Sequence, residues 1–236
     1  MAGAVVAGGV SLAHEAPPEG VERFGDVAAL AAVCDVVVDF THASTASGHA
    51  GALAVASIPW ILGTTGLSAA DQQCVRAAAQ RIAIVQAANF SPGVNLVLAL
   101  ARQLGAALPA AEYDVEVLDM HHRQKMDSPS GTALALGEAV ARGRGASLAE
   151  LRLPPRDGHD GARPQGGIGF AALRGGQVVG DHTVLFAAAD EQIALTHRAF
   201  DRLPFARGAV RAAFWAAGRP PGLYSMMDVL GMEAAR

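Results

Sequence analysis

The chain has 236 residues, of which 51% are hydrophobic and 17% are charged, and its formal net charge is −4. This composition supplies a sizeable apolar core, and the negative charge argues against a nucleic acid as partner. No apolar run approaches the roughly 18 residues of a membrane span, and the N-terminus shows neither a basic leader nor a clear cleavage site. Cys34 and Cys74 are too few for a disulfide framework or a zinc cage. We therefore expect a cytoplasmic protein without a membrane partner.

The first part of the chain alternates short apolar runs with helical patterns. The apolar runs predict buried strands, at Ala4–Ala7, Val33–Asp39, Ile58–Leu62 and Ile82–Val85. The intervening patterns predict helices, at Asp26–Ala32, Thr45–Ala56 and Ala69–Gln80. This alternation predicts an α/β fold with a Rossmann-type, doubly wound parallel sheet.

A small polar loop follows each of the last three predicted strands. These loops are Asp39–His42, Gly63–Gly66 and Ala87–Gly93. Ligands of open parallel sheets bind outside the carboxyl ends of the strands. A single loop of this kind could be only a turn, but three at matching positions favour a nucleotide site.

The pattern changes after Gly93. Helices are predicted at Val94–Leu108, Thr132–Arg142 and Phe205–Ala217, with a long loop over Arg142–Gly167. Strands are predicted at Tyr113–Met120, Ile168–Leu173, Val178–Phe186 and Gln192–Arg198, and Gly175–Gly176 is predicted to join the second and third of them in a hairpin. We therefore expect a second, α+β domain with a mixed or antiparallel sheet. The predicted domains are residues 1–92 with 203–236, which bind a dinucleotide, and residues 93–202, which bind substrate and assemble the oligomer.

The stretch His121–Thr132 places two imidazoles, a guanidinium and an ammonium within five residues and then opens a helix. Ser130 is a plausible N-cap, and Gly131 and Thr132 would offer backbone N–H groups to an anion. Positive donors beside a helix N-terminus form a site for a carboxylate, and a histidine or lysine there can deliver a proton.

Other interpretations of this cluster are weaker. A solvated, charged loop would not require a capped helix start. A metal site is disfavoured because His121 and His122 would point to opposite sides of a strand, so we expect no metal. His159, His182 and His197, each taken alone, are expected to be packing or hydrogen-bonding residues.

Seven segments of the chain, in order, carry a family resemblance. They are Val38–Thr41, Gly63–Gly66, Ala87–Ser91, His121–Thr132, Gly180–Thr183, Thr196–Ala199 and Phe205–Val210. In these segments the chain resembles the bacterial 4-hydroxy-tetrahydrodipicolinate reductases, also called dihydrodipicolinate reductases, of lysine and diaminopimelate biosynthesis. The His-His-x-x-Lys-x-Asp-x-Pro-Ser-Gly-Thr string is the most specific of the matches.

The resemblance implies a hydride transfer from NADH or NADPH to a small cyclic dicarboxylate by a homotetramer. It implies that His121 or Lys125 is the proton donor. The residues implied in substrate binding are His122, Ser130, Gly131 and Thr132. The residues implied in holding the nicotinamide half of the cofactor are Phe40, Thr41, Gly63, Thr64, Thr65, Ala87, Ala88, Asn89 and Phe90.

The start of the chain departs from the family pattern. The Gly-rich turn of the family does not occur in the sequence, and Gly8–Gly9 does not replace it, because no helix-opening pattern follows. We expect residues 2–9 to be the second strand, and a strand, turn and helix of about 30 residues to precede Met1 in the natural protein. Two alternatives stay open: a related two-domain nicotinamide-dependent dehydrogenase, and a truncated, non-catalytic homologue that binds an acidic metabolite.

Overall fold

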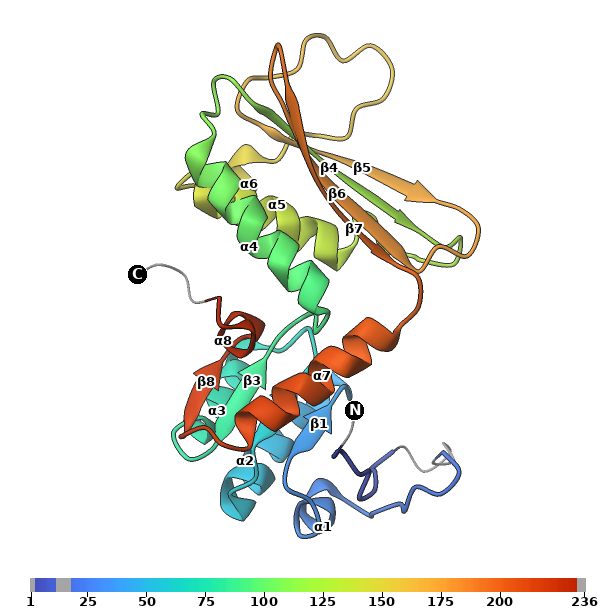
Figure 1. Ribbon diagram of the computed structural model, residues 1–236, viewed down its shortest axis with the longest axis vertical. Coiled ribbons are helices and arrows are strands. Elements are labelled where there is room, and N and C mark those ends of the chain that lie inside the picture. Colours follow the sequence, from blue (N-terminus) through green and yellow to red (C-terminus); the bar gives the residue numbers. More distant parts are fainter. Residues whose placement is uncertain (1–2, 12–17, 233–236) are drawn as a thin grey trace. The chain divides into compact units, whose positions relative to one another are not determined.

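The computed structural model describes residues 3–11 and 18–232. The chain forms two compact units, Met1–Ser91 with Phe205–Arg236, and Pro92–Pro204. The chain thus leaves the first unit, completes the second, and returns to the first (Figure 1). No described helix is long and apolar enough to cross a membrane.

The first unit is built on a parallel sheet with helices on both faces. The strands follow the order β1 (Val37–Asp39), β2 (Trp60–Leu62), β3 (Ala83–Gln86) and β8 (Gly222–Tyr224). On one face the sheet packs with α1 (Val27–Ala31), α2 (Ala46–Ala56) and α3 (Ala69–Ala78), and on the other with α7 (Leu203–Ala216) and α8 (Met226–Leu230). A 3-10 turn, Ala43–Thr45, precedes α2.

Alternate side chains of β2 show why this sheet is doubly wound. Trp60 and Leu62 pack in the core with α2 and α3, whereas Ile61 packs in the core with α7 and α8. All three side chains are fully buried. The continuous apolar runs seen in the sequence therefore follow from burial of the strands on both faces, which confirms the predicted α/β fold.

Two expectations for this unit need correction, and two of its elements were not predicted. Ala4–Ala7 forms no strand, and Val5 is 90% exposed. Near this segment, Gly9 instead exchanges backbone hydrogen bonds with Glu22 and Phe24. Without a strand partner, the backbone groups of residues 4–7 gain nothing from an extended ladder. The predicted strand over Val33–Asp39 is shorter, beginning at Val37, and β8 with α8 was not predicted.

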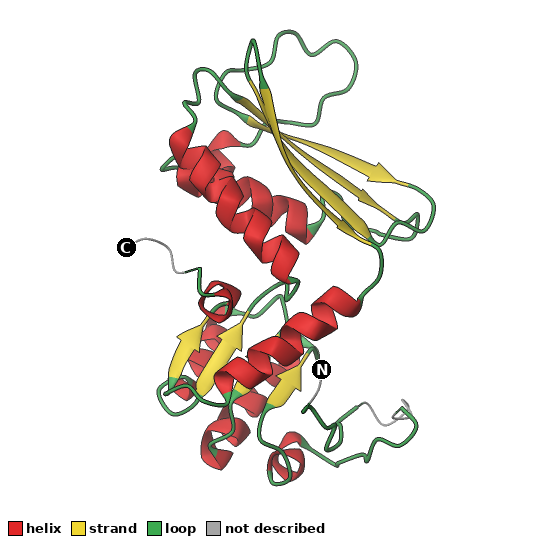
Figure 2. Ribbon diagram, viewed as in Figure 1, coloured by secondary structure: helices red, strands yellow, loops and turns green. Residues whose placement is uncertain are grey.

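The second unit is a four-stranded mixed sheet with helices on one face, as Figure 2 shows. The strand order is β5 (Ile168–Arg174), β4 (Asp114–His121), β6 (Gly180–Ala187) and β7 (Gln192–Ala199), with β4 parallel to β5 and antiparallel to β6. Alternate residues of β4 and β6 are buried beneath α4 (Pro92–Ala107) and α5 (Gly131–Gly143). This alternation is typical of a sheet covered on one face, and it confirms the predicted second α+β domain.

The predicted hairpin at Gly175–Gly176 is wrong, because β4 lies between β5 and β6. The connection instead wraps around the end of β4: Gly175 N donates to His121 O at 2.9 Å, and His122 N donates to Val178 O at 2.7 Å. Backbone groups at the end of β4 thus find partners in this connection. A short helix, α6 (Leu148–Leu151), also interrupts the predicted long loop.

Candidate active site

The buried face of the second unit's sheet changes from apolar to polar at the end of β4. Val115 and Val117 are followed on the same face by Asp119 and His121, which are 1% and 7% exposed. The cross-strand partner of Asp119 on β6 is His182, which is 5% exposed. Three ionisable side chains are therefore buried side by side at one end of this sheet.

Asp119 ties this end of the sheet to the start of α5. Its Oδ2 accepts a 2.5 Å hydrogen bond from Ser130 N, and its Oδ1 accepts one of 2.5 Å from Arg174 Nη1. Burial would raise the pKa of the Asp119 carboxyl, but the hydrogen bonds from Arg174 and Ser130 outweigh it and hold the pKa below its usual range. Asp119 is therefore an ionised carboxylate with both oxygens engaged.

Ser130 is the N-cap of α5, as predicted. Its Oγ accepts a hydrogen bond from Ala133 N at 3.2 Å and lies 3.1 Å from His182 Nε2. The hydroxyl and the amide of this 2% exposed residue are thus both used inside the protein. Ser130 fixes where α5 begins, and with it the direction of the backbone N–H groups in the first turn of the helix.

His121 is the least satisfied member of the network. Its Nδ1 lies 3.8 Å from Asp119 Oδ1 and has no hydrogen-bond partner among the described residues. Its ring meets that of His182 edge to face, with centroids 5.0 Å apart. Burial lowers the pKa of His121 despite the opposing charge of Asp119, and burial lowers the pKa of His182 to about 4. Both rings are therefore neutral at pH 7.

One ligand-type atom each from Asp119, His121 and His182 lie within 4.8 Å of one another. Such a trio can hold a metal ion in principle. Here both oxygens of Asp119 already accept hydrogen bonds, one of them from a guanidinium that would face the ion. We therefore interpret the trio as a buried polar cluster, in which Asp119 and His182 contact Ser130 by hydrogen bonds and His121 lies against them.

The loop between β4 and α5 holds the remaining predicted residues. Lys125 N donates to His122 O at 3.1 Å, and Lys125 Nζ lies 2.8 Å from Asp127 Oδ1. Lys125, Gly131 and Thr132 thus lie in one short segment around the start of α5. The His122 ring contacts Gln124 at 3.2 Å and is not part of the Asp119 network.

In the first unit, two of the three predicted loops meet. Phe40, Thr41 and Gly63–Gly66 line a pocket of about 380 Å³ at the carboxyl ends of β1 and β2. The third loop reaches the same place through Phe90, whose ring lies edge to face with that of Phe40, with centroids 5.5 Å apart. A Cβ on Gly63 would lie 2.2 Å from the Phe40 ring, so only glycine fits there without displacing it.

Asp39 fastens these loops and was not singled out in the sequence. It is 3% exposed and accepts hydrogen bonds from the Thr41 hydroxyl at 2.6 Å and from Trp60 Nε1 at 3.2 Å, while His49 Nδ1 lies 2.8 Å away. Burial opposes its ionisation, but the hydrogen bonds from His49 and Thr41 outweigh burial and lower the pKa of Asp39 to about 2. An acidic residue at the end of an otherwise apolar strand was the available signal.

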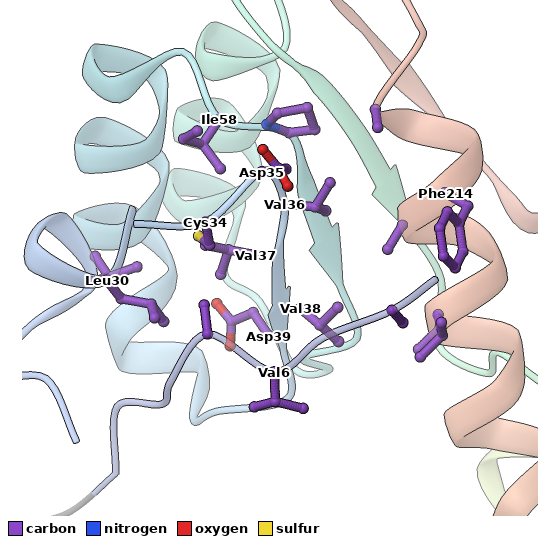
Figure 3. A pocket seen from close by; sticks show the side chains of 18 of the residues that line it. Val6, Leu30, Cys34, Asp35, Val36, Val37, Val38, Asp39, Ile58 and Phe214 are labelled. Carbon is purple, nitrogen blue, oxygen red and sulfur yellow. The ribbon is translucent and has the colours of Figure 1, made fainter. Parts of the chain in front are cut away.

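A larger open cavity of about 1320 Å³ also lies in the first unit (Figure 3). Val36, Val38 and Asp39 of the β1 segment line it together with Val6 and Phe214. Within the described residues, β1 pairs with β2 alone. The cavity is therefore bordered by a strand with unpaired backbone groups and by aliphatic side chains.

The comparisons with known proteins agree along the whole chain. The family model for the N-terminus of dihydrodipicolinate reductase matches residues 4–90, and the one for its C-terminus matches residues 93–230. A 4-hydroxy-tetrahydrodipicolinate reductase of Granulibacter bethesdensis is 62% identical over 92% of this chain and 83% of its own length. That of Acidiphilium cryptum is 59% identical over 98% of this chain and 93% of its own length.

A solved structure shares the fold. The dipicolinate-bound dihydrodipicolinate reductase of a Paenisporosarcina species superposes with a TM-score of 0.73 at 22% identity, covering 91% of this chain and 81% of the other. The matches of both family models, and relatives at about 60% identity, establish the assignment expected from the sequence. The chain belongs to the dihydrodipicolinate reductase family.

Proposed function

We propose that this protein is a 4-hydroxy-tetrahydrodipicolinate reductase of lysine and diaminopimelate biosynthesis. It reduces 4-hydroxy-2,3,4,5-tetrahydrodipicolinate to 2,3,4,5-tetrahydrodipicolinate: a hydride and a proton enter, and the hydroxyl leaves as water. The observation that carries the proposal is the buried Asp119–His121–His182 network beside the lysine-bearing loop and the start of α5, in a chain of this family.

The second unit is suited to a substrate with two carboxylates. The N-terminus of α5 places the backbone N–H groups of Gly131 and Thr132 at the positive end of the helix dipole. Lys125 adds an ammonium from the same loop, and His122 adds an imidazole. Charge-assisted hydrogen bonds of this kind contribute about 1.5–3 kcal/mol each. Ser130 acts by fixing the start of α5, since its own polar atoms are engaged inside.

His121 and Lys125 are the candidates for the proton transfer. His121 is a neutral, buried imidazole whose Nδ1 has no hydrogen-bond partner among the described residues, so it is free to hold or pass a proton. Lys125 is an ammonium on the adjoining loop. A proton donor positioned in this way contributes about 10²–10⁴-fold to the rate.

The first unit is suited to NADH or NADPH. Phe40, Thr41 and Gly63–Thr65 would hold the nicotinamide half in the 380 Å³ pocket, and Ala87–Phe90 would support it through the Phe90 ring. The absence of a Cβ on Gly63 lets the Phe40 ring lie against the backbone of this loop, which shapes the pocket. The bound cofactor supplies the hydride, and Asp39 keeps the loops in place.

The location and assembly belong to the same proposal. We place the protein in the cytoplasm, as a homotetramer formed through the sheet of the second unit. The exposed alternate residues of β7 leave one face of that sheet open to a second copy. Light scattering in solution tests the assembly.

The function is tested by nicotinamide oxidation with the substrate, and by calorimetry with pyridine-2,6-dicarboxylate as an unreactive analogue. We expect turnover with one or both cofactors, and competitive binding of the analogue. Analogue binding without cofactor binding would favour the non-catalytic alternative. Turnover of an amino acid instead of the cyclic dicarboxylate would favour the related dehydrogenase.

A further inference from the structure

Two groups expected to hold a substrate carboxylate already hold a carboxylate of the protein. Lys125 Nζ lies 2.8 Å from Asp127 Oδ1. The Asp127 carboxylate also lies near the start of α5, where the Gly131 N–H adds to the Lys125 ammonium in lowering the pKa of Asp127. One side chain of the loop therefore joins the ammonium to the helix N-terminus.

Asp127 differs in exposure from the other carboxylate of the cluster. Asp119 is 1% exposed, whereas the Asp127 side chain is 58% exposed. The main chain of Asp127 is fixed, because its carbonyl oxygen accepts a 2.6 Å hydrogen bond from Arg174 Nη2, and Arg174 is itself anchored on Asp119. The carboxylate can thus rotate into solvent while the loop stays in place.

We propose that Asp127 sets the affinity and selectivity of the substrate site by occupying, with its own carboxylate, the place of a substrate carboxylate on Lys125 and the Gly131 amide. This inference rests on the proposed function, because it concerns the same site. Two carboxylates cannot share one ammonium closely without repulsion, so Asp127 leaves when the substrate arrives.

The consequence is a threshold for ligands. A carboxylate held on the same loop competes at an effective concentration on the order of millimolar or more. A ligand with a single carboxylate gains little by exchanging one ion pair for another. A dicarboxylate adds contacts elsewhere in the site and so pays this cost more easily. At a given ligand concentration, Asp127 therefore keeps out monocarboxylates, whose few contacts do not outweigh it.

The experiment compares Asp127→Asn with the parent by calorimetry, using pyridine-2,6-dicarboxylate and pyridine-2-carboxylate. The Kd of the dicarboxylate is expected to fall about two- to fivefold, the worth of an exposed ion pair, and that of the monocarboxylate by at least as much. Asp190→Asn, which removes a carboxylate from the exposed turn between β6 and β7, is the matched control and leaves both values unchanged.

Unchanged or weaker binding by Asp127→Asn would overturn the inference, and weaker binding would show that Asp127 organises Lys125 instead of competing for it. A second measurement needs no variant: the pKa of the Asp127 carboxyl in the parent, followed by NMR, rises when the dicarboxylate binds, because Lys125 is taken and a negative ligand lies nearby. A constant pKa at saturation contradicts the proposal. If the analogue binds neither parent nor variant, the proposed function fails, and this inference fails with it.

Discussion

Each unit buries one aspartate at the carboxyl end of a strand, and the two aspartates are satisfied differently. Asp39 in the first unit has its histidine at hydrogen-bond distance, with His49 Nδ1 2.8 Å from Oδ2. Asp119 in the second unit gives its oxygens to Arg174 and Ser130, which leaves His121 Nδ1 at 3.8 Å. The first network is complete and holds loops in place. The second leaves a buried imidazole unsatisfied, which is a condition for chemistry.

The largest effect is expected from substitutions of the two candidate proton donors in the second unit. His121→Gln and Lys125→Ala each remove one candidate for the proton donor. Loss of the true donor is expected to lower turnover by about 10²–10⁴-fold. The thermal unfolding temperature of both variants should be nearly unchanged. The measurement is steady-state reduction kinetics. His159→Gln, at an exposed histidine of the same unit, is the matched control.

The variant with the larger loss identifies the proton donor. Turnover of Lys125→Ala within threefold of the parent would remove Lys125 from a catalytic role, and the same result for His121→Gln would remove His121.

The next prediction distinguishes the two units by the pH at which each loses stability. The pKa of His182 is lowered by burial from 6.5 to about 4, with His121, His197 and Lys125 adding repulsion and Asp119 opposing. As the pH falls, His182 is therefore protonated in the unfolded chain before it is protonated in the folded one. The folded state keeps its full stability above pH 6.5 and loses stability as the pH falls toward 4. The expected loss in the free energy of unfolding is about 3 kcal/mol for this one histidine.

Thermal unfolding by circular dichroism from pH 7.5 to 4 measures this loss. His182→Gln is expected to flatten the dependence between pH 6.5 and 4, while His159→Gln keeps it. An equally steep dependence in His182→Gln would show that another group titrates.

The first unit is expected to respond at lower pH. The pKa of Asp39 is lowered from 3.8 to about 2, so its stabilisation is present above pH 3.8 and is lost as the pH falls through 2. At neutral pH, Asp39→Asn should cost about 2 kcal/mol. Trp60 and Trp215 both lie in this unit, so tryptophan fluorescence during denaturation reports on it.

Asp35→Asn, at an exposed position before β1, is the control for Asp39→Asn and should leave the denaturation midpoint unchanged. Equal midpoints for the two variants would mean that the Asp39 network contributes no net stability.

The smallest effect concerns the cofactor loops that the first network supports. Gly63→Ala forces the Phe40 ring aside, and since Phe40 is 57% exposed the ring has room to move. We expect about 1 kcal/mol, or roughly fivefold, weaker binding of NADH or NADPH, with little change in stability. Nicotinamide fluorescence titration measures it. Gly51→Ala, where an added Cβ meets nothing within 4 Å, should bind the cofactor like the parent.

Much of the fold could be predicted because its signals are local. The buried runs at β2 and β3, the helix patterns of α2 and α3, and the Ser130 cap are each encoded within a few residues. The predictions that failed both concern which strands pair with each other. Residues 4–7 join no strand, and Gly9 forms only an isolated bridge with Arg23. The wrong hairpin came from reading two neighbouring strands as partners although β4 lies between them.

For the candidate site, the sequence by itself determined which residues are gathered on one loop. His121, Lys125 and Gly131 lie close in the chain, and a capped helix start needs no distant partner to form. The tertiary structure alone decided which of these groups is left unsatisfied. Asp119 finds Arg174 55 residues away, and His182 reaches Ser130 across 52 residues. Strand order and register set these pairings, and neither is written in a local pattern.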